Sequence, residues 1–510
     1  MLITALGSVE ALLMCAAAFP LFRMNGNTFS EAASYAIICV FMLLSFIRQI
    51  SIIAGIPLLS SGIEAFFLIV SMIVVFKQRS HIAGTLKVIK TFISANPVIF
   101  VFLGLCFLLM AVHTFLPLPK EWQYEFFNII AAENEGGFSS WSGQGASAIL
   151  QLNHLVLFKP LLFKPLLVSG TGASAGIVGF VAYLSIAFST YALARRYSWP
   201  PTALTTTVLV MSMPRLVSQT IFPGTQIVSI AVALFCILAI YRSVELPNQV
   251  DIIFLVLGFF FCISENISSM IFTPILFILS WVVLFRRHGF LTWKIISGTK
   301  WYAVFAVAPA VVFSHCWLFI YPYSASWSGV FSGIAFNKDG IQGALANSIR
   351  YVFESFCFSV PINLVFGPSL NWGLNWDTAP VLQSLYDRFI GPVLGESGAA
   401  NVFSITDLPN AIFSFGPVGF FLIIPALCYA MLKGPRRLKA VAISFLVYFY
   451  MICLIFSWAP DNMKLFANFY VCAGFSIAFL LPPWRFSKRI KKVFQAGACL
   501  VLFSTLMASL

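Results

Sequence analysis

The sequence predicts an all-α, polytopic membrane protein with 12–14 transmembrane helices, and three observations carry this prediction. Of the 510 residues, 60% are apolar and only 9% are charged, whereas soluble globular chains contain about 25% charged residues. The apolar residues form runs close to the ~20 residues that a helix needs to cross a bilayer. The 32 Gly and 26 Pro follow no fixed period, which excludes a collagen-like chain.

The apolar runs account for nearly the whole chain, so we expect residues 1–510 to form a single integral membrane domain. Two of the runs, 202–222 and 251–264, are weak or short. The predicted spans are 3–22, 34–54, 57–76, 96–117, 170–194, 202–222, 226–241, 251–264, 269–285, 301–320, 409–432, 439–457, 465–482 and 493–510.

The distribution of basic residues predicts the orientation of these spans. If the loop after the third span is cytoplasmic, alternation places 21 of the 30 Lys and Arg residues on the cytoplasmic side. Cytoplasmic loops of membrane proteins are enriched in Lys and Arg, and the opposite orientation would reverse this rule. The formal net charge of +13 therefore indicates membrane topology rather than a nucleic-acid partner.

Two long segments, 118–169 and 321–408, then fall on the outer side as the first and second outer loops. Both contain aromatic residues next to spans, which is typical of juxtamembrane amphipathic helices in the headgroup layer. In the first, Glu121 and Glu125 are four residues apart, so a helix would place both carboxylates on one face. Such carboxylates can act as a general base or hold a divalent cation, and the competing interpretation is two solvated surface charges.

Several charged residues fall close to or inside the apolar runs. For Arg48 and Glu64, near the ends of spans, we expect the side chains to snorkel toward the membrane surface. Arg215 follows Pro214 in the middle of a weak span, where it cannot easily snorkel and could meet a lipid-linked phosphate. The 11 Cys form neither a CxxC pattern nor a Cys/His cluster, so the sequence suggests no disulfide framework and no zinc site.

Four stretches in order resemble polytopic glycosyltransferases of the GT-C superfamily, especially the bacterial members like protein-O-mannosyltransferases and lipid-A-sugar transferases. They cover roughly residues 95–480. The stretches are Trp122-Gln123-Tyr124; Ser212-Met213-Pro214 with Gln219; Asn347-Ser348-Ile349-Arg350-Tyr351 with the later Ser404-Ile405-Thr406-Asp407; and Trp458-Ala459-Pro460-Asp461-Asn462 with Lys464.

The resemblance implies transfer of a sugar from a polyisoprenyl-phosphate donor to a cell-envelope acceptor, with inversion, at the outer face of the bacterial inner membrane. It implies a catalytic acid in the first outer loop. Gln123 stands where the family usually carries Asp, so Glu125 is our first candidate for the base and Glu121 the second. The candidate substrate-binding residues are Arg215, Arg350, Lys464, Trp122, Tyr124 and Asp407.

Other functions remain open from the sequence. The chain could be a lipid or polysaccharide flippase or transporter, an O-antigen-type polymerase or ligase, or an inactive GT-C homologue, because Gln cannot serve as a base. A transporter would favour inverted repeats, and no convincing repeat is visible. The expected partners are membrane lipids and a lipid-linked sugar, with no nucleic acid. The metal requirement and the oligomeric state stay open, a divalent cation being the candidate cofactor.

We predict that the segments Lys77–Lys90, Arg286–Lys300 and Lys433–Lys439 all lie on the cytoplasmic side, because together they carry much of the basic excess. Reporter fusions in each segment, or labelling of introduced cysteines with a membrane-impermeant reagent, would measure this. A single segment found on the outer side would contradict the predicted topology.

Overall fold

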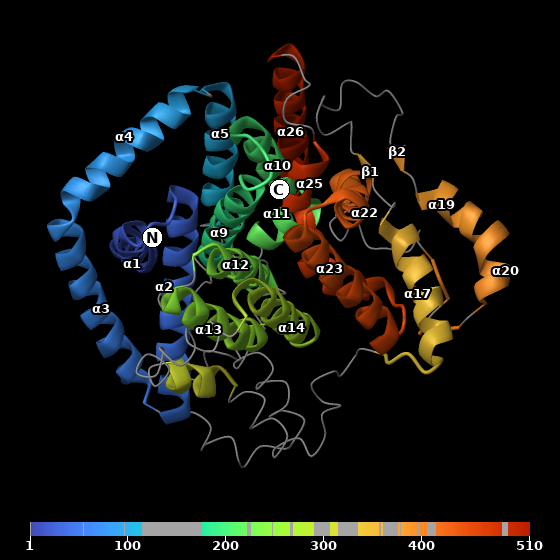
Figure 1. Ribbon diagram of the computed structural model, residues 1–510, viewed down its shortest axis with the longest axis horizontal. Coiled ribbons are helices and arrows are strands. Elements are labelled where there is room, and N and C mark those ends of the chain that lie inside the picture. Colours follow the sequence, from blue (N-terminus) through green and yellow to red (C-terminus); the bar gives the residue numbers. More distant parts are fainter. Residues whose placement is uncertain are drawn as a thin grey trace. The chain divides into compact units, whose positions relative to one another are not determined.

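The computed structural model describes residues 2–54, 56–95, 97–114, 176–221, 226–246, 248–265, 269–289, 306–314, 335–355, 359–360, 376–377, 379–395, 397–400, 402–404, 415–481 and 488–509. These residues are almost entirely helical (Figure 1). The exception is a short antiparallel pair, β1 (Ser359–Val360) with β2 (Trp376–Asp377). The prediction of an all-α chain is therefore confirmed for the described residues.

Six of the described helices are long and apolar enough to cross a membrane, as expected for a multi-pass protein. They lie in α2 (Phe29–Ala54), α3 (Pro57–Lys77), α9 (Gly176–Ala194), α12 (Gln226–Glu245), α14 (Ser269–His288) and α23 (Arg436–Ile455). Shorter apolar helices occur at 99–112, 419–433 and 467–480. The expected total of 12–14 spans includes residues that the structure does not describe.

The chain divides into two compact units. The first comprises Met1–Ala192, Gln219–Ser269 and Leu284–Phe331, and the second Leu193–Ser218, Met270–Val283 and Ser332–Leu510. The first contains α1 (Leu2–Met24), α2, α3, α4 (Arg79–Ala95), α5 (Pro97–Thr114), most of α9, α12 and α13 (Gln249–Glu265).

The core helix of the first unit is α12, whose residues 227–244 are all buried. A helix that is apolar on every side is typical of such a central position. It packs against α2 and, most extensively, against α13. Gly258 of α13 permits the close approach, because a Cβ there would lie 2.7 Å from the Cys236 Sγ of α12. Tyr35 and Phe235 contact edge to face beside this seam, with ring centroids 4.7 Å apart.

The second unit is built around α23 and the helices that follow it. These are 3₁₀ turns at Pro460–Phe466 and Gly474–Ser476, α24 (Ala467–Ala473), α25 (Ile477–Leu480) and α26 (Lys488–Ser509). Before α23 come α10 (Pro200–Met211), α17 (Gly340–Ser355), α19 (Ala379–Leu385), α20 (Gly391–Leu394), α21 (Gly416–Val418) and α22 (Ile424–Lys433). π-helical turns join α19 to α20 and α21 to α22. Within this unit α17 and α22 pack on α23, and α10 packs on α26.

The structure differs from the predicted spans in several places. The run 465–482 is divided among 3₁₀ turns, α24 and α25. The run 202–222 is broken into α10 and α11 (Pro214–Ile221), because Pro214 has no amide hydrogen to continue α10 and instead begins a new helix. The segment between the spans at 57–76 and 96–117 is the helix α4 rather than a loop. Its apolar residues recur with a helical period, but it is too polar to be found as a membrane span.

We predict that Gly474→Ala destabilises the protein, because a Cβ at Gly474 would lie 2.4 Å from Val210 Cγ2 of α10. Overpacking of this kind costs about 1–3 kcal/mol. The matched control is Gly497→Ala in α26, where nothing lies within 4 Å of the added Cβ; it should be neutral or stabilising by up to about 1 kcal/mol. Thermal unfolding of the detergent-purified variants measures both, and equal midpoints would contradict the close contact.

Candidate functional site

The structure describes three of the eight candidate site residues. Glu121, Trp122, Tyr124, Glu125 and Asp407 lie outside the described residues. Arg215, Arg350 and Lys464 all belong to the second unit. Arg215 is buried near the start of α11, and Arg350 is buried in α17. Lys464 lies on the 3₁₀ turn Pro460–Phe466.

The second unit joins two stretches on which the family resemblance depends. The segment after α23 contains Trp458, and α17 contains Asn347 and Arg350. The Asn347 amide donates to the carbonyl oxygens of Cys453 (3.3 Å) and Phe456 (3.1 Å), near the end of α23. At the end of a helix the last carbonyls have no amide of a following turn to bond to. The Asn347 side chain supplies the missing donor at the end of α23. We call this region, residues 335–355 with 395, 397–400 and 453–462, the α17 junction.

Backbone pairing holds the Trp458 segment on both sides. On one side Phe336 pairs with Phe456 as an antiparallel bridge, and on the other Ala399 pairs with Trp458 as a parallel bridge. The Trp458 amide donates to the Gly398 carbonyl at 2.9 Å, and the Ala400 amide donates to the Trp458 carbonyl at 3.0 Å. A segment bonded on both edges has little conformational freedom, so the chain entering the Pro460–Phe466 turn is fixed in place.

Arg350 provides the side-chain centre of the α17 junction. The residue is 1% exposed, and its guanidinium donates to the carbonyls of Ser397 (2.5 Å) and Gly395 (2.7 Å). It also donates to Tyr386 Oη at 3.0 Å and to Asn347 Oδ1 at 3.2 Å. A planar guanidinium can serve several acceptors at once, as an ammonium cannot. Arg350 therefore ties Gly395 and Ser397 to α17.

Glu354, one turn after Arg350, completes the junction. It is buried, and its Oε2 accepts a hydrogen bond from Trp458 Nε1 at 3.1 Å. Burial, and then the nearby Glu354 carboxylate, raise the pKa of the Tyr351 phenol well above its ordinary value. The phenol therefore keeps its proton over the physiological range and donates, over 3.5 Å, to the Ser457 carbonyl. Glu354 was not among the residues predicted from the sequence, although its i,i+4 spacing from Arg350 places both on one helix face.

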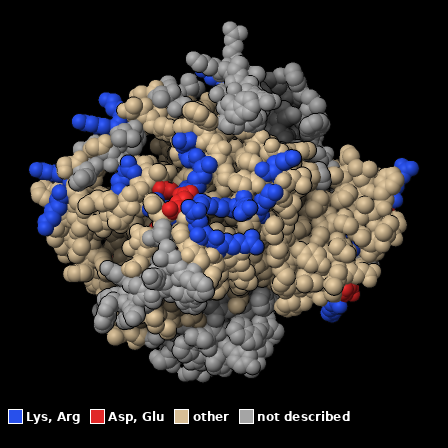
Figure 2. Space-filling model, in the orientation of Figure 1, with Lys and Arg blue, Asp and Glu red and all other residues tan. Residues whose placement is uncertain are grey.

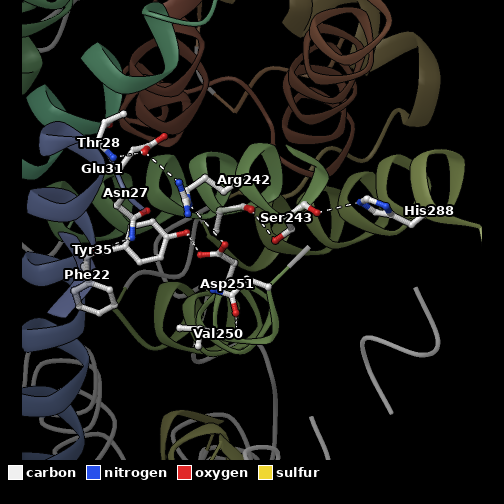
Figure 3. Close-up of polar contacts among 12 residues, drawn as sticks. Phe22, Asn27, Thr28, Glu31, Tyr35, Arg242, Ser243, Val250, Asp251 and His288 are labelled. Carbon is white, nitrogen blue, oxygen red and sulfur yellow. Dashed lines mark hydrogen bonds and ion pairs between the residues drawn. The ribbon is translucent and has the colours of Figure 1, made fainter. Parts of the chain in front are cut away.

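The first unit contains a second polar cluster, which the sequence did not single out (Figure 3). Arg242 near the end of α12 bonds Glu31 Oε2 at 3.2 Å, and its Nε lies 3.6 Å from Asp251 Oδ2. Tyr35 donates to Asp251 Oδ1 at 2.8 Å, and the Thr28 amide donates to Glu31 Oε2 at 2.8 Å. This charge cluster connects α2, α12 and α13, and all three of its charged side chains are buried.

Arg48 and Glu64 correct one expectation. They do not snorkel to the membrane surface: both side chains are buried, and Arg48 Nε lies 2.8 Å from Glu64 Oε1. The pair joins α2 to α3. Each charge can be buried because the opposite charge of its partner neutralises it. Near it in the sequence, Ser45 of α2 donates to the buried Glu265 carboxylate of α13 at 3.2 Å. Sequence spacing could not reveal either pair, because the partners lie on different helices.

Within the ranges that the structure describes, no group of three or more His, Cys, Asp or Glu side chains is arranged to hold a metal ion. The chain was also compared with protein-family models, with curated proteins and with solved structures. None of them matches. The candidate site therefore stands on its own geometry: a rigid polar junction in which a carboxylate, an indole and a guanidinium are buried together.

We predict that Arg350→Lys destabilises the protein by about 2–4 kcal/mol, because an ammonium cannot satisfy two carbonyls, an amide and a phenol at once. The matched control is Arg388→Lys, whose guanidinium is exposed and lies 5.4 Å from the Phe389 ring centroid; we expect a change within about 0.5 kcal/mol. Thermal unfolding in detergent measures the difference. Similar midpoints for the two variants would show that Arg350 does not hold the junction together.

Proposed function

We propose that the chain is a multi-pass membrane glycosyltransferase of the GT-C type. It would transfer a sugar from a polyisoprenyl-phosphate donor to a cell-envelope acceptor at the outer face of the bacterial inner membrane. The observation that carries the proposal is the α17 junction. Two stretches about 110 residues apart, each of which resembles these enzymes, lie together there. Asn347 of the first donates to Phe456, two residues before the second, and Trp458 of the second donates to Glu354, three residues after the first.

A position at the membrane surface is supported by the outward side of α17. Ile341, Leu345 and Ile349 recur every four residues and are exposed, opposite the side that carries Asn347 and Arg350. In the neighbouring helices, Val381, Leu385, Phe389 and Val393 repeat the same spacing and are also exposed. Exposed apolar stripes of this length are unfavourable in water and typical of helices that lie in the membrane interface. The junction would then lie at the depth of lipid phosphates.

The residues have distinct roles in this proposal. Arg215 and Lys464 are the candidates to neutralise the donor phosphate, because a departing polyisoprenyl phosphate needs a cation or a charge-assisted donor. Arg350 is a positioning residue, since its guanidinium is bonded to the carbonyls of Gly395 and Ser397. Trp122, Tyr124 and Asp407 remain candidates for contacts with the sugar, and a divalent cation remains the candidate cofactor.

The reaction needs one base. Glu125, or else Glu121, would take the proton from the acceptor hydroxyl as its oxygen attacks the anomeric carbon of the donor sugar. The bond from that carbon to the phosphate oxygen breaks with inversion, and polyisoprenyl phosphate leaves. A carboxylate next to aromatic residues and lipid headgroups is partly desolvated, which raises its affinity for protons and suits this role.

We predict that Glu125→Gln lowers the transfer rate by about 10²–10⁴-fold, the usual effect of removing a general base. Glu133→Gln, an equal change in the same outer loop, is the matched control and should leave the rate unchanged. Cells lacking the chain would be complemented with each variant, and their envelope glycans compared by mass spectrometry. Rates would then be measured in isolated membranes containing equal amounts of protein.

The outcomes separate the candidates. Loss of transfer in Glu121→Gln but not in Glu125→Gln would move the base to Glu121. Normal transfer in both single variants and in the double variant would exclude this pair. If the complemented and uncomplemented cells have the same envelope glycans, the glycosyltransferase proposal itself is wrong.

A transporter is the second candidate, and the buried ion pairs of the first unit favour it. Arg48 with Glu64, and Arg242 with Glu31 and Asp251, place charged side chains among apolar helices, where they often mark ion or substrate pathways. A transporter moves a lipid-linked sugar without breaking the bond from the sugar to the phosphate. Recovery of the donor intact on the far side of reconstituted vesicles would favour transport, whereas release of polyisoprenyl phosphate would favour transfer.

A further inference from the structure

The helix α4 is held at the boundary of the membrane by its connections. A single residue separates it from α3, which is long and apolar enough to span, and a single residue separates it from the apolar helix α5. Figure 1 shows α3, α4 and α5 following one another along the chain, with α4 lying across the direction of its neighbours. Neither end of α4 can therefore move far from the membrane surface.

Its sequence gives α4 two unlike sides. At about 100° per residue, Arg79, Lys87 and Lys90 fall within one sector of the helix, whereas Phe92 falls on the opposite side. The three basic side chains are exposed. The chain has no Asp or Glu between Glu64 and Glu121, so no acidic residue of this segment offsets them.

The aromatic residue Phe92 of α4 packs on the neighbouring helices, whereas Ile93 beside it is exposed. The Phe92 ring lies 5.5 Å from the Phe100 ring of α5 and 6.1 Å from the Tyr191 ring of α9. On the polar side, Thr91 and Ser94 donate to the carbonyls of Lys87 and Lys90 within the helix itself. The Arg79 guanidinium lies 5.1 Å from the centroid of the exposed Phe76 ring, at the end of α3.

We infer that the basic side of α4 binds the headgroups of anionic phospholipids. The helix lies where headgroups lie, its aromatic side packs on apolar helices, and its exposed charge has one sign. Basic amphipathic helices with this arrangement lie in the membrane interface and are attracted to negatively charged lipids. In Figure 2, the edge that α3 and α4 occupy in Figure 1 shows blue basic side chains and no red acidic ones. The inference depends on the membrane location alone and not on glycosyl transfer.

The full chain, reconstituted into nanodiscs, tests this inference by hydrogen–deuterium exchange of peptides from 79–95. One set of nanodiscs contains phosphatidylcholine alone, and the other contains phosphatidylglycerol in place of part of it. We expect exchange in α4 to be about tenfold slower in the anionic bilayer, and less so at high salt, because surface attraction stabilises the bound helix and salt screens it. The fully buried α12 is the internal reference and should not change.

Two variants distinguish charge from other effects. The triple variant Arg79→Gln, Lys87→Gln, Lys90→Gln should exchange equally fast in both bilayers, whereas Lys87→Arg with Lys90→Arg keeps the charge and should behave as the wild type. All three positions are exposed, so the fold should tolerate these changes. Equal exchange of wild-type α4 in the two bilayers, or an anionic effect that survives in the triple Gln variant, would overturn the inference.

Discussion

Charge inside an apolar bundle has to be neutralised or hydrogen-bonded, and the arrangement of this chain follows from that constraint. In the first unit, Arg48 pairs with Glu64, and Arg242 lies between the carboxylates of Glu31 and Asp251. In the second unit, the charge of the Arg350 guanidinium is instead hydrogen-bonded to backbone carbonyls and a phenol. Each solution fixes two or more segments together, so polar groups specify which helices become neighbours while apolar residues supply the general attraction.

Long apolar runs made most of the helices predictable, because a membrane helix is recognised by length and composition alone. The charge pairs were not predictable, since Arg48 and Glu64 interact only once α2 and α3 lie side by side. The helix α4 was also not predicted, because its mean hydropathy is too low for a membrane span. Only the periodicity of its apolar residues indicates a helix. For the candidate site, the sequence indicated Arg350 and the Trp458 stretch. It could not indicate Glu354, Tyr386 or the carbonyls of Gly395 and Ser397, which tertiary structure brings to them.

Within the ranges that the structure describes, irregular helices are concentrated in the second unit. Pro214 separates α10 from α11, π-helical turns interrupt the segments at 386–390 and 419–423, and 3₁₀ turns flank α24. Such departures leave backbone groups without helical partners, and they recur at functional sites in other proteins. Among the described residues of the resemblance, Pro214 and Lys464 lie in such segments and Arg350 bonds Tyr386 of a third. By contrast, α12 and α13 of the first unit are uninterrupted. The regular part supplies a rigid scaffold, and the irregular part supplies shaped turns, of which those around α24 are buried.

The length of α4 has a mechanical consequence. A helix of 17 residues is about 25 Å long, and it meets α3 and α5 through single-residue connections. The two neighbouring helices must therefore leave the membrane surface about two helix diameters apart. Their separation is thus set by a rigid spacer in the plane of the headgroups rather than by side chains packed between them. Shortening this spacer by one turn would draw the ends of α3 and α5 together by about 5 Å, so the lateral layout of the first unit is encoded in the residue count of a surface helix.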